Sequence, residues 1–210
     1  MIDNLFTSPV FFIINIFALL VAITVHEFSH ALIADRLGDP TPQLQGRLTL
    51  NPLAHLDLYG TIFLLFFGFG WGKPVQFDPY NLHNPRKDAA LISLGGPASN
   101  FIVAIVSSII LRLLLFFSVP ILTTVATVIL PSIIYLNIIL GVFNLLPIEP
   151  LDGFKIVGGL LSEEKAREWY QLARYGIIFL LLLIIPINGR SMLSIIMTQI
   201  ISPLRMLLIP

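Results

Sequence analysis

The sequence contains no cysteine, and charged side chains make up only 11% of its 210 residues. Without cysteine there is neither a disulfide framework nor a cysteine-ligated metal site, so any metal must be held by His, Asp, Glu or other oxygen donors. An ordinary soluble domain carries roughly 25% charged residues, which cover its surface. The scarcity of charge therefore excludes a cytosolic enzyme, a nucleic-acid-binding protein and a disordered chain.

The chain also has no formal net charge, because 12 basic residues balance 12 acidic ones. No net charge steers the chain toward nucleic acid, and we expect no such partner. What the sequence does contain is apolar residues, at 56% of the total. This composition predicts a multi-pass membrane protein whose surroundings are a lipid bilayer, organised as a single domain over residues 1–210.

Three apolar runs are long enough to cross a bilayer as helices of about 20 residues. They cover residues 9–34, 89–117 and 120–146. The runs 169–187 and 191–208 are weaker candidates, because basic and other polar residues or proline interrupt them. The run 58–71 has the length of a re-entrant or interfacial segment rather than of a span.

The basic residues predict an orientation. Five lie between the first two spans and four lie at 155–174 after the third, whereas the residues before the first span and the connection at 118–120 contain none. If the segment 58–71 dips into the membrane and returns, all nine lie on one face. Because cytoplasmic loops are rich in Lys and Arg, this pattern favours the dip, with the N-terminus outside.

The sequence His26-Glu27-Phe28-Ser29-His30 lies near the end of the first predicted span. Residues four apart share a helix face, so His26 and His30 can offer two nitrogens to one ion, and Glu27 can reach a water on it. This is the H-E-x-x-H arrangement of zinc metalloproteases. Ionisable groups inside a span usually mark function. The alternative is a helix end whose polar residues meet the headgroups.

A second polar segment, residues 143–153, closes the third span and contains Asp152 between prolines and Gly153. Proline ends the helix, and irregular backbone at membrane depth is tolerated only where it lines a protein cavity. Asp152 is a natural third zinc ligand, since two histidines and a carboxylate leave the fourth position open for water. Glu149 is a rival ligand. An ordinary span exit with Asp152 in water is a further alternative.

Topology connects the two motifs. His30 lies near the C-terminal end of the first span, and Asp152 lies just past the C-terminal end of the third. They can meet at one zinc only if the segment 58–71 returns to the face from which it entered. The charge pattern and the metal geometry therefore favour the same topology.

These residues resemble the motifs of the site-2 proteases, the intramembrane zinc metalloproteases. HEFSH at 26–30 matches the zinc motif of that family, and Asn144 with Leu151-Asp152-Gly153 matches its N-to-LDG motif. GGPASN at 95–100 is similar to its glycine-proline-asparagine motif, and segments 51–57 and 70–75 resemble its compact prokaryotic branch. The resemblance runs over residues 10–155.

The resemblance implies an all-α multi-pass membrane protein. A three-helix catalytic core over residues 9–155 would include a re-entrant or short β-hairpin segment, and peripheral helices would follow over 156–210. Parts of the family have a span before the zinc-motif helix or a PDZ or CBS domain, and neither is evident here.

The resemblance also implies an activity, the cleavage of transmembrane substrate proteins by a zinc endopeptidase of the cytoplasmic membrane. One Zn²⁺ per chain would be held by His26, His30 and Asp152, within the bilayer but nearer the cytoplasmic face. Glu27 would be the general base that activates the zinc-bound water, and Asn144 would face the substrate. A helical substrate must unwind before cleavage, and segments 44–50 and 58–71 are predicted to offer it an edge strand.

Three other functions were weighed against the protease. A metal or solute transporter is expected to show inverted repeats, and the sequence shows none. A non-catalytic membrane chaperone with the same fold is expected to lose Glu27 or a ligand, and all are present. A zinc protease of another class, with Glu149 as third ligand, would change the chemistry little. The sequence carries no signal for an oligomeric state.

Overall fold

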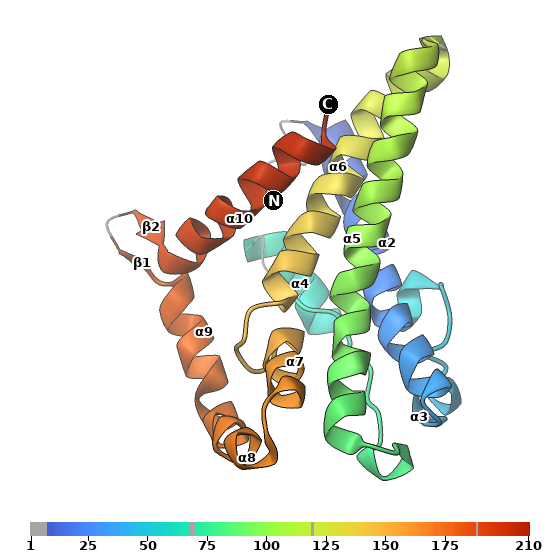
Figure 1. Cartoon of the computed structure of the whole chain (residues 1–210). Helices are drawn as coiled ribbons and strands as arrows, with labels where there is room; N and C mark the ends of the chain where they lie inside the picture. Colours follow the sequence, from blue (N-terminus) through green and yellow to red (C-terminus); the bar gives the residue numbers. More distant parts are fainter. Residues whose placement is uncertain (1–7, 68–69, 119, 188) are drawn as a thin grey trace.

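Three long helices form the centre of the protein. They are α2 (Pro9–Arg36), α5 (Pro85–Phe117) and α6 (Pro120–Asn144). The structure, a computed structural model, describes residues 8–67, 70–118, 120–187 and 189–210. In Figure 1 α5 and α6 run side by side in opposite directions, and α2 packs against both. Each helix begins at a proline, whose fixed backbone angle and missing N–H suit the first turn.

Among the described residues, these three helices are the ones long and apolar enough to cross a membrane. The predicted spans 9–34, 89–117 and 120–146 are therefore confirmed, although α5 begins earlier, at Pro85, and α6 ends at Asn144. The chain is a mostly helical membrane protein. We predict an outside location for the residues before the first span and for the connection at 118–120. Residues 1–7 and 119 of these segments lie outside the described residues.

Short elements connect α2 to α5. They are α3 (Thr41–Leu44), the 3₁₀ turn η1 (Pro52–Ala54), α4 (Leu58–Phe67) and the 3₁₀ turn η2 (Pro79–Asn81). The ten residues of α4 span about 15 Å, half of the hydrocarbon thickness of a bilayer, so α4 cannot cross a membrane as a helix. The length of α4 is therefore compatible with a segment that returns to the face from which it entered, as the zinc geometry requires.

The prediction of an edge strand over 58–71 is wrong for Leu58–Phe67, because these residues form α4. Residues 68–69 lie outside the described part. In the described residues of 44–72 no strand forms, and the β pairing amounts to one isolated antiparallel bridge between Leu56 and Gly72. Re-entry of this segment into the membrane stays a prediction.

In the described residues after α6 the chain forms seven elements. They are α7 (Asp152–Leu160), α8 (Glu163–Gln171), the 3₁₀ turn η3 (Leu172–Tyr175), α9 (Gly176–Ile184), β1 (Pro186–Ile187), β2 (Arg190–Ser191) and α10 (Met192–Leu208). The run 169–187 is therefore not one span, since it is divided between α8, η3, α9 and β1. β1 and β2 pair in an antiparallel ladder. The run 191–208 forms α10, which is shorter than a typical span.

A hydrophobic core lies between α5, α6 and α10, and its buried members are Ala104, Leu111, Ala126, Ile134, Ile138, Val142 and Ile201. Polar contacts tie the C-terminal end of α10 to α5. Arg112 Nη2 donates to Leu207 O at 2.6 Å, and Ser108 Oγ donates to Leu208 O at 2.5 Å. These donors satisfy carbonyl groups that have no partner within the last turn of a helix.

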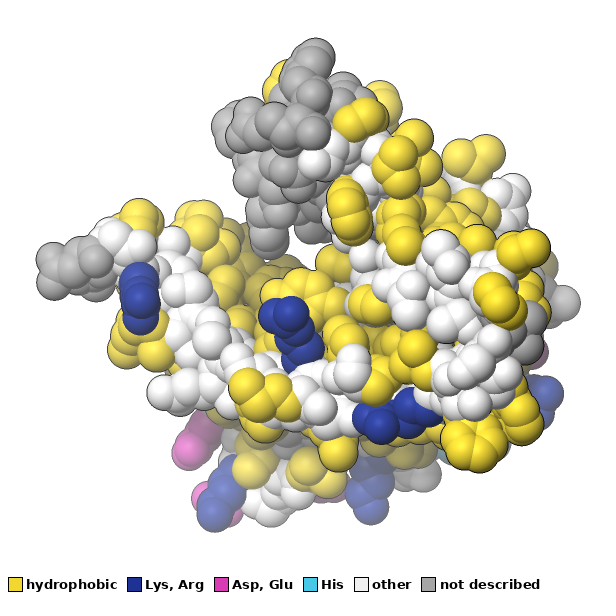
Figure 2. Space-filling view, turned by 90° about the horizontal axis from the view of Figure 1, so that it is seen from above, with side chains coloured by type: hydrophobic (Ala, Val, Ile, Leu, Met, Phe, Trp, Pro, Cys, Tyr) yellow, Lys and Arg dark blue, Asp and Glu magenta, His cyan; other side chains and the backbone are white. Residues whose placement is uncertain are grey.

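Much of the exterior is apolar. In Figure 2, the view from above, hydrophobic side chains are spread widely over the visible face, whereas Lys and Arg side chains are few and scattered. On α9 five large apolar side chains are more than half exposed, namely Ile177, Ile178, Phe179, Leu181 and Leu182. Contiguous apolar surface of this kind suits lipid rather than water.

Asp39 holds together the connection between α2 and α5. It is fully buried, and it accepts hydrogen bonds from Thr41 N and Oγ1, from Asn81 Nδ2 and from Asp78 N at 2.6–3.0 Å. Burial raises the pKa of Asp39, but the hydrogen bonds from Thr41, Asn81 and Asp78 outweigh it and hold the pKa below its ordinary value. The ionised carboxylate therefore contributes to stability.

We expect Asp39→Asn to destabilise the protein at pH 7 by about 1–3 kcal/mol, because an amide cannot accept all four bonds. A depressed folded pKa means that the contribution is complete above the unfolded pKa of about 3.9 and is lost as pH falls through the folded value. Thermal unfolding in detergent between pH 3 and 7 measures this. The difference in unfolding temperature between wild type and variant should narrow below about pH 4. A difference that stays constant over this range contradicts a stabilising role for ionised Asp39, and Asp35→Asn serves as the control.

Candidate metal centre

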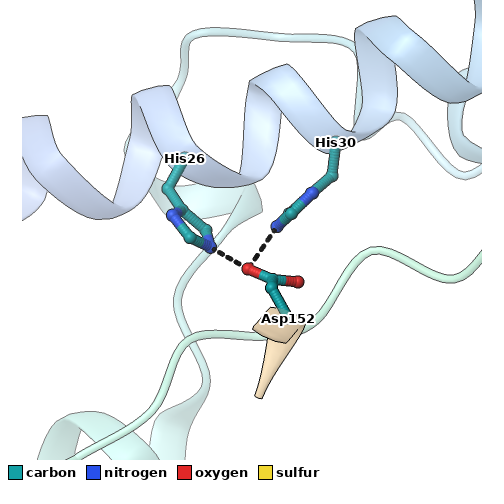
Figure 3. Close-up of side chains that lie close together, drawn as sticks. All are labelled: His26, His30 and Asp152. Carbon is teal, nitrogen blue, oxygen red and sulfur yellow. Dashed lines mark ion pairs between the residues drawn. The ribbon is translucent and has the colours of Figure 1, made fainter. Parts of the chain in front are cut away.

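Two elements far apart in the sequence bring three potential metal ligands together (Figure 3). His26 and His30 lie one turn apart on the same face of α2, and Asp152 is the first residue of α7. Asp152 Oδ2 is 3.1 Å from His26 Nε2 and 3.3 Å from His30 Nε2. The three ligand atoms all lie within 4.8 Å of one another.

Oxygen acceptors hold the opposite nitrogen of each imidazole. His26 Nδ1 is 2.7 Å from Asn100 Oδ1, and His30 Nδ1 is 2.7 Å from the carbonyl oxygen of Ile92. A nitrogen that faces an oxygen acceptor must carry the hydrogen, so each Nδ1 donates. The Nε2 atoms then direct their lone pairs toward Asp152, which is the orientation of metal-ligating histidines.

Electrostatics shows that the site fits a cation. His26 and His30 are 4% and 7% exposed, and Asp152 Oδ2 is buried without a hydrogen-bond partner among the described residues. A carboxylate oxygen and two imidazole lone pairs repel one another at this range unless positive charge lies between them. Ligands at 2.0–2.1 Å from a tetrahedral zinc ion are about 3.3 Å apart, close to the 3.1 and 3.3 Å between Asp152 Oδ2 and the two Nε2 atoms.

The position of Asp152 follows from a tight turn after α6. Gly153 packs so closely on the backbone of Leu145 and Leu146 that a Cβ atom would overlap their carbonyl groups. Glycine is therefore needed for this close approach, which sets the start of α7 beneath α2.

Gly96 gives α5 its close approach to the site. A Cβ atom at this position would lie 2.5 Å from His30 Nε2 and 2.6 Å from His26 Nε2. The small residues at 95–99 therefore do more than let helices pack, because Gly96 leaves the space into which both ligand atoms point.

Glu27 is held beside the site by groups from the loop between α2 and α5. Its Oε2 accepts a hydrogen bond from Val75 N at 3.1 Å and lies 3.9 Å from Arg47 Nη2. Arg47 is itself buried and donates to the carbonyl groups of Ala54 and Lys73, so it joins two parts of the loop at the Glu27 carboxylate.

Asn144 lies at the last residue of α6, before the turn to Asp152. Its Nδ2 donates to Leu140 O of the same helix at 3.0 Å. None of its hydrogen bonds in the described part of the chain reaches His26, His30 or Asp152. The predicted role of Asn144 toward a substrate stays a prediction.

Glu149, the rival third ligand, does not lie in this cluster. Its backbone carbonyl and Cβ pack against Gly176 at the start of α9. The carboxylate that meets both histidines belongs to Asp152.

Some groups that support the site were not predicted from the sequence. Nothing in the sequence signals the role of the Ile92 carbonyl or of Arg47, because both act through contacts between distant segments. Asn100 belongs to the GGPASN motif already noted, and Asn137 carried a detectable signal, since it places an amide group inside an otherwise apolar span.

Two histidines on one helix and a carboxylate from another element form the ligand set of a catalytic zinc site. The fold and site are therefore those of a membrane protein that could hold a catalytic zinc ion. Comparison with family models agrees: Peptidase family M50 matches residues 14–128 and 120–185. The chain belongs to Peptidase family M50, the site-2 protease family of zinc metalloproteases.

The chain is similar to two curated bacterial proteins. It is 38% identical over 178 residues to "Putative zinc metalloprotease YwhC" of Bacillus subtilis, which covers 83% of this chain and 81% of that protein. It is 31% identical over 186 residues to "Putative zinc metalloprotease Rip2" of Mycobacterium tuberculosis H37Rv, which covers 85% of this chain and 70% of that protein. The comparison with solved structures gave no match.

We expect Gly96→Ala to weaken zinc binding by at least about tenfold, the lower range for changes next to metal ligands, because the new methyl group overlaps the ligand atoms. Chelator competition on the purified protein measures this affinity. The control is Gly95→Ala, whose methyl group meets the flexible tip of Ile33 instead. Zinc affinity in Gly96→Ala equal to that in Gly95→Ala contradicts this geometry.

Proposed function

We propose that the protein is an intramembrane zinc endopeptidase that hydrolyses peptide bonds in or near the transmembrane helices of other membrane proteins. One observation carries the proposal. His26, His30 and Asp152 converge in a buried position beside helices that are long enough to span a bilayer. Soluble substrates do not reach such a position, whereas a helix that lies in the same membrane does.

His26, His30 and Asp152 are the residues that would hold a single Zn²⁺ per chain. Zinc, when bound, lowers the pKa of a coordinated water and polarises the carbonyl of the bond to be cleaved. Two imidazoles and one carboxylate leave a fourth position for water and substrate. Residues 1–210 would act as one catalytic domain, in which α8, α9 and α10 surround the core.

Glu27 is the proposed general base. Val75 N and Arg47 lie at Oε2, which leaves Oε1 to accept a proton from water. As a general acid, Glu27 would then deliver this proton to the leaving amine. The contacts to Oε2 fix the direction of the carboxylate, and this is the requirement for proton transfer over hydrogen-bond distance.

The proposed location is the cytoplasmic membrane, with the site nearer the cytoplasmic face. The C-terminal half of α2 and the first residue of α7 meet at the site, and most basic residues lie in the segments that follow α2 and α6. The excess of Lys and Arg on cytoplasmic loops supports this orientation. The short helix α4 would then enter the membrane and return on the same side.

Asn144 is the proposed substrate-facing residue. It lies in the last turn of α6, and the α6–α7 turn places Asp152 at the histidines. If its amide turns away from Leu140 O, it can donate to the backbone of an unwound substrate or to the developing oxyanion.

The proposal predicts different effects for Glu27→Gln and Asp152→Ala. Glu27→Gln should keep zinc and lose cleavage by about 10²–10⁴-fold, because it removes the base and spares the ligands. Asp152→Ala should lose zinc affinity as well. Zinc analysis and cleavage of a model transmembrane substrate in detergent provide both readouts.

Glu149→Gln is the matched control, since it neutralises a carboxylate outside the ligand cluster and should keep zinc and activity. Undiminished turnover in Glu27→Gln would reject Glu27 as the base. A well-folded wild-type protein that binds zinc and cleaves no membrane substrate favours the chaperone or transporter functions over the protease.

A further inference from the structure

Behind His26 a chain of buried amide groups crosses all three long helices. His26 Nδ1 on α2 lies 2.7 Å from Asn100 Oδ1 on α5, and Asn100 Nδ2 donates to Asn137 Oδ1 on α6 at 2.9 Å. Asn100 and Asn137 are both fully buried. Buried amides in an apolar bundle are costly unless every donor and acceptor is paired, so this chain is more than packing.

Two backbone carbonyls fix the direction of the hydrogen bonds. Asn100 Nδ2 donates to Ala22 O at 3.0 Å as well as to Asn137, and Asn137 Nδ2 donates to Ile133 O at 2.8 Å. A backbone carbonyl can only accept. If either amide turned over, its oxygen would face a carbonyl oxygen and one buried donor would lose its acceptor. The two amides therefore have one favourable arrangement, with the Asn100 oxygen toward His26.

This arrangement decides which nitrogen of His26 is free. The Asn100 oxygen accepts from Nδ1–H, which leaves the lone pair of Nε2 for the metal. His30 also carries its hydrogen on Nδ1, but its acceptor is the carbonyl of Ile92, whose orientation is set by the helix backbone. Of the two histidines, His26 is thus the one whose proton position depends on a side chain that could be reversed.

We propose that Asn137 is a positioning residue for the zinc site, which acts through Asn100 to keep His26 in the metal-binding form. Without the acceptor at position 137, Asn100 no longer loses a hydrogen bond to that residue when its amide reverses. The NH₂ group of a reversed Asn100 can then face His26 Nδ1. The proton of His26 then moves to Nε2, the nitrogen that must bind the metal. The inference rests on the proposed function only in requiring that the site holds zinc.

The test compares the zinc affinity of metal-depleted variants by chelator competition. Asn137→Leu keeps the approximate shape and removes the acceptor, and we expect about tenfold weaker zinc binding, the lower range for residues that orient metal ligands. Asn137→Asp should restore the affinity to within about threefold of wild type, because a neutral carboxyl group has one donor for Ile133 O and one acceptor for Asn100. If Asn137→Leu does not fold, Asn137→Ala removes the same acceptor without adding apolar volume.

Ile134→Ala is the control for packing, because Ile134 is fully buried on the same helix and has no polar group. It should lower the unfolding temperature without changing zinc affinity. The inference is overturned if Asn137→Leu and Asn137→Ala bind zinc like wild type, if Asn137→Asp is as weak as Asn137→Leu, or if Ile134→Ala weakens zinc equally. A folded wild type that binds no zinc overturns the proposed function and this inference together.

Discussion

A carboxylate and two imidazoles that face one another in an apolar helix bundle require a positive charge between them. In this protein the requirement joins α2 to α7, since His26 and His30 approach one oxygen of Asp152 at 3.1 and 3.3 Å. Water does not compensate such groups when they are buried, so a metal ion or protons must. The packing of α2 and α7 on α5 keeps these atoms together.

The bundle meets this requirement with small residues and with fixed acceptors. Gly96 lets α5 approach until its backbone borders the space between the ligand atoms, and Gly153 lets the α6–α7 turn close. The acceptors Asn100 Oδ1 and Ile92 O, both from α5, then set the orientation of the two imidazoles. α5 is therefore a structural support of the metal site although it contributes no ligand.

The sequence predicted the parts of the protein that depend on local pattern. Helix period and apolar length placed the three spans, and the i, i+4 spacing of His26 and His30 indicated a metal pair. Asp152 could be matched to them because it is a carboxylate in the proline-broken exit of the third span, and the charge pattern favoured a topology in which it can reach them. In each case the informative residues are close in the chain or linked by a simple rule.

What the sequence did not predict depends on packing between distant segments. The segment 58–71 contains a helix instead of an edge strand, and an apolar run of that length does not distinguish the two. The run 169–187 is divided between α8, η3, α9 and β1, whose bounds its composition does not give. The contacts of Arg47 with Glu27 and of Asn137 with Asn100 become visible only once the helices are assembled.

The most direct test of the central claim is X-ray absorption spectroscopy at the zinc edge on the purified wild-type protein in detergent. A site built from His26, His30 and Asp152 predicts a zinc shell of two imidazole nitrogens with oxygen ligands, at about 2.0–2.2 Å. Imidazole rings produce characteristic outer-shell scattering, so the number of histidines can be read from the spectrum. A shell with no imidazole, or with a single one, contradicts a site built from His26, His30 and Asp152.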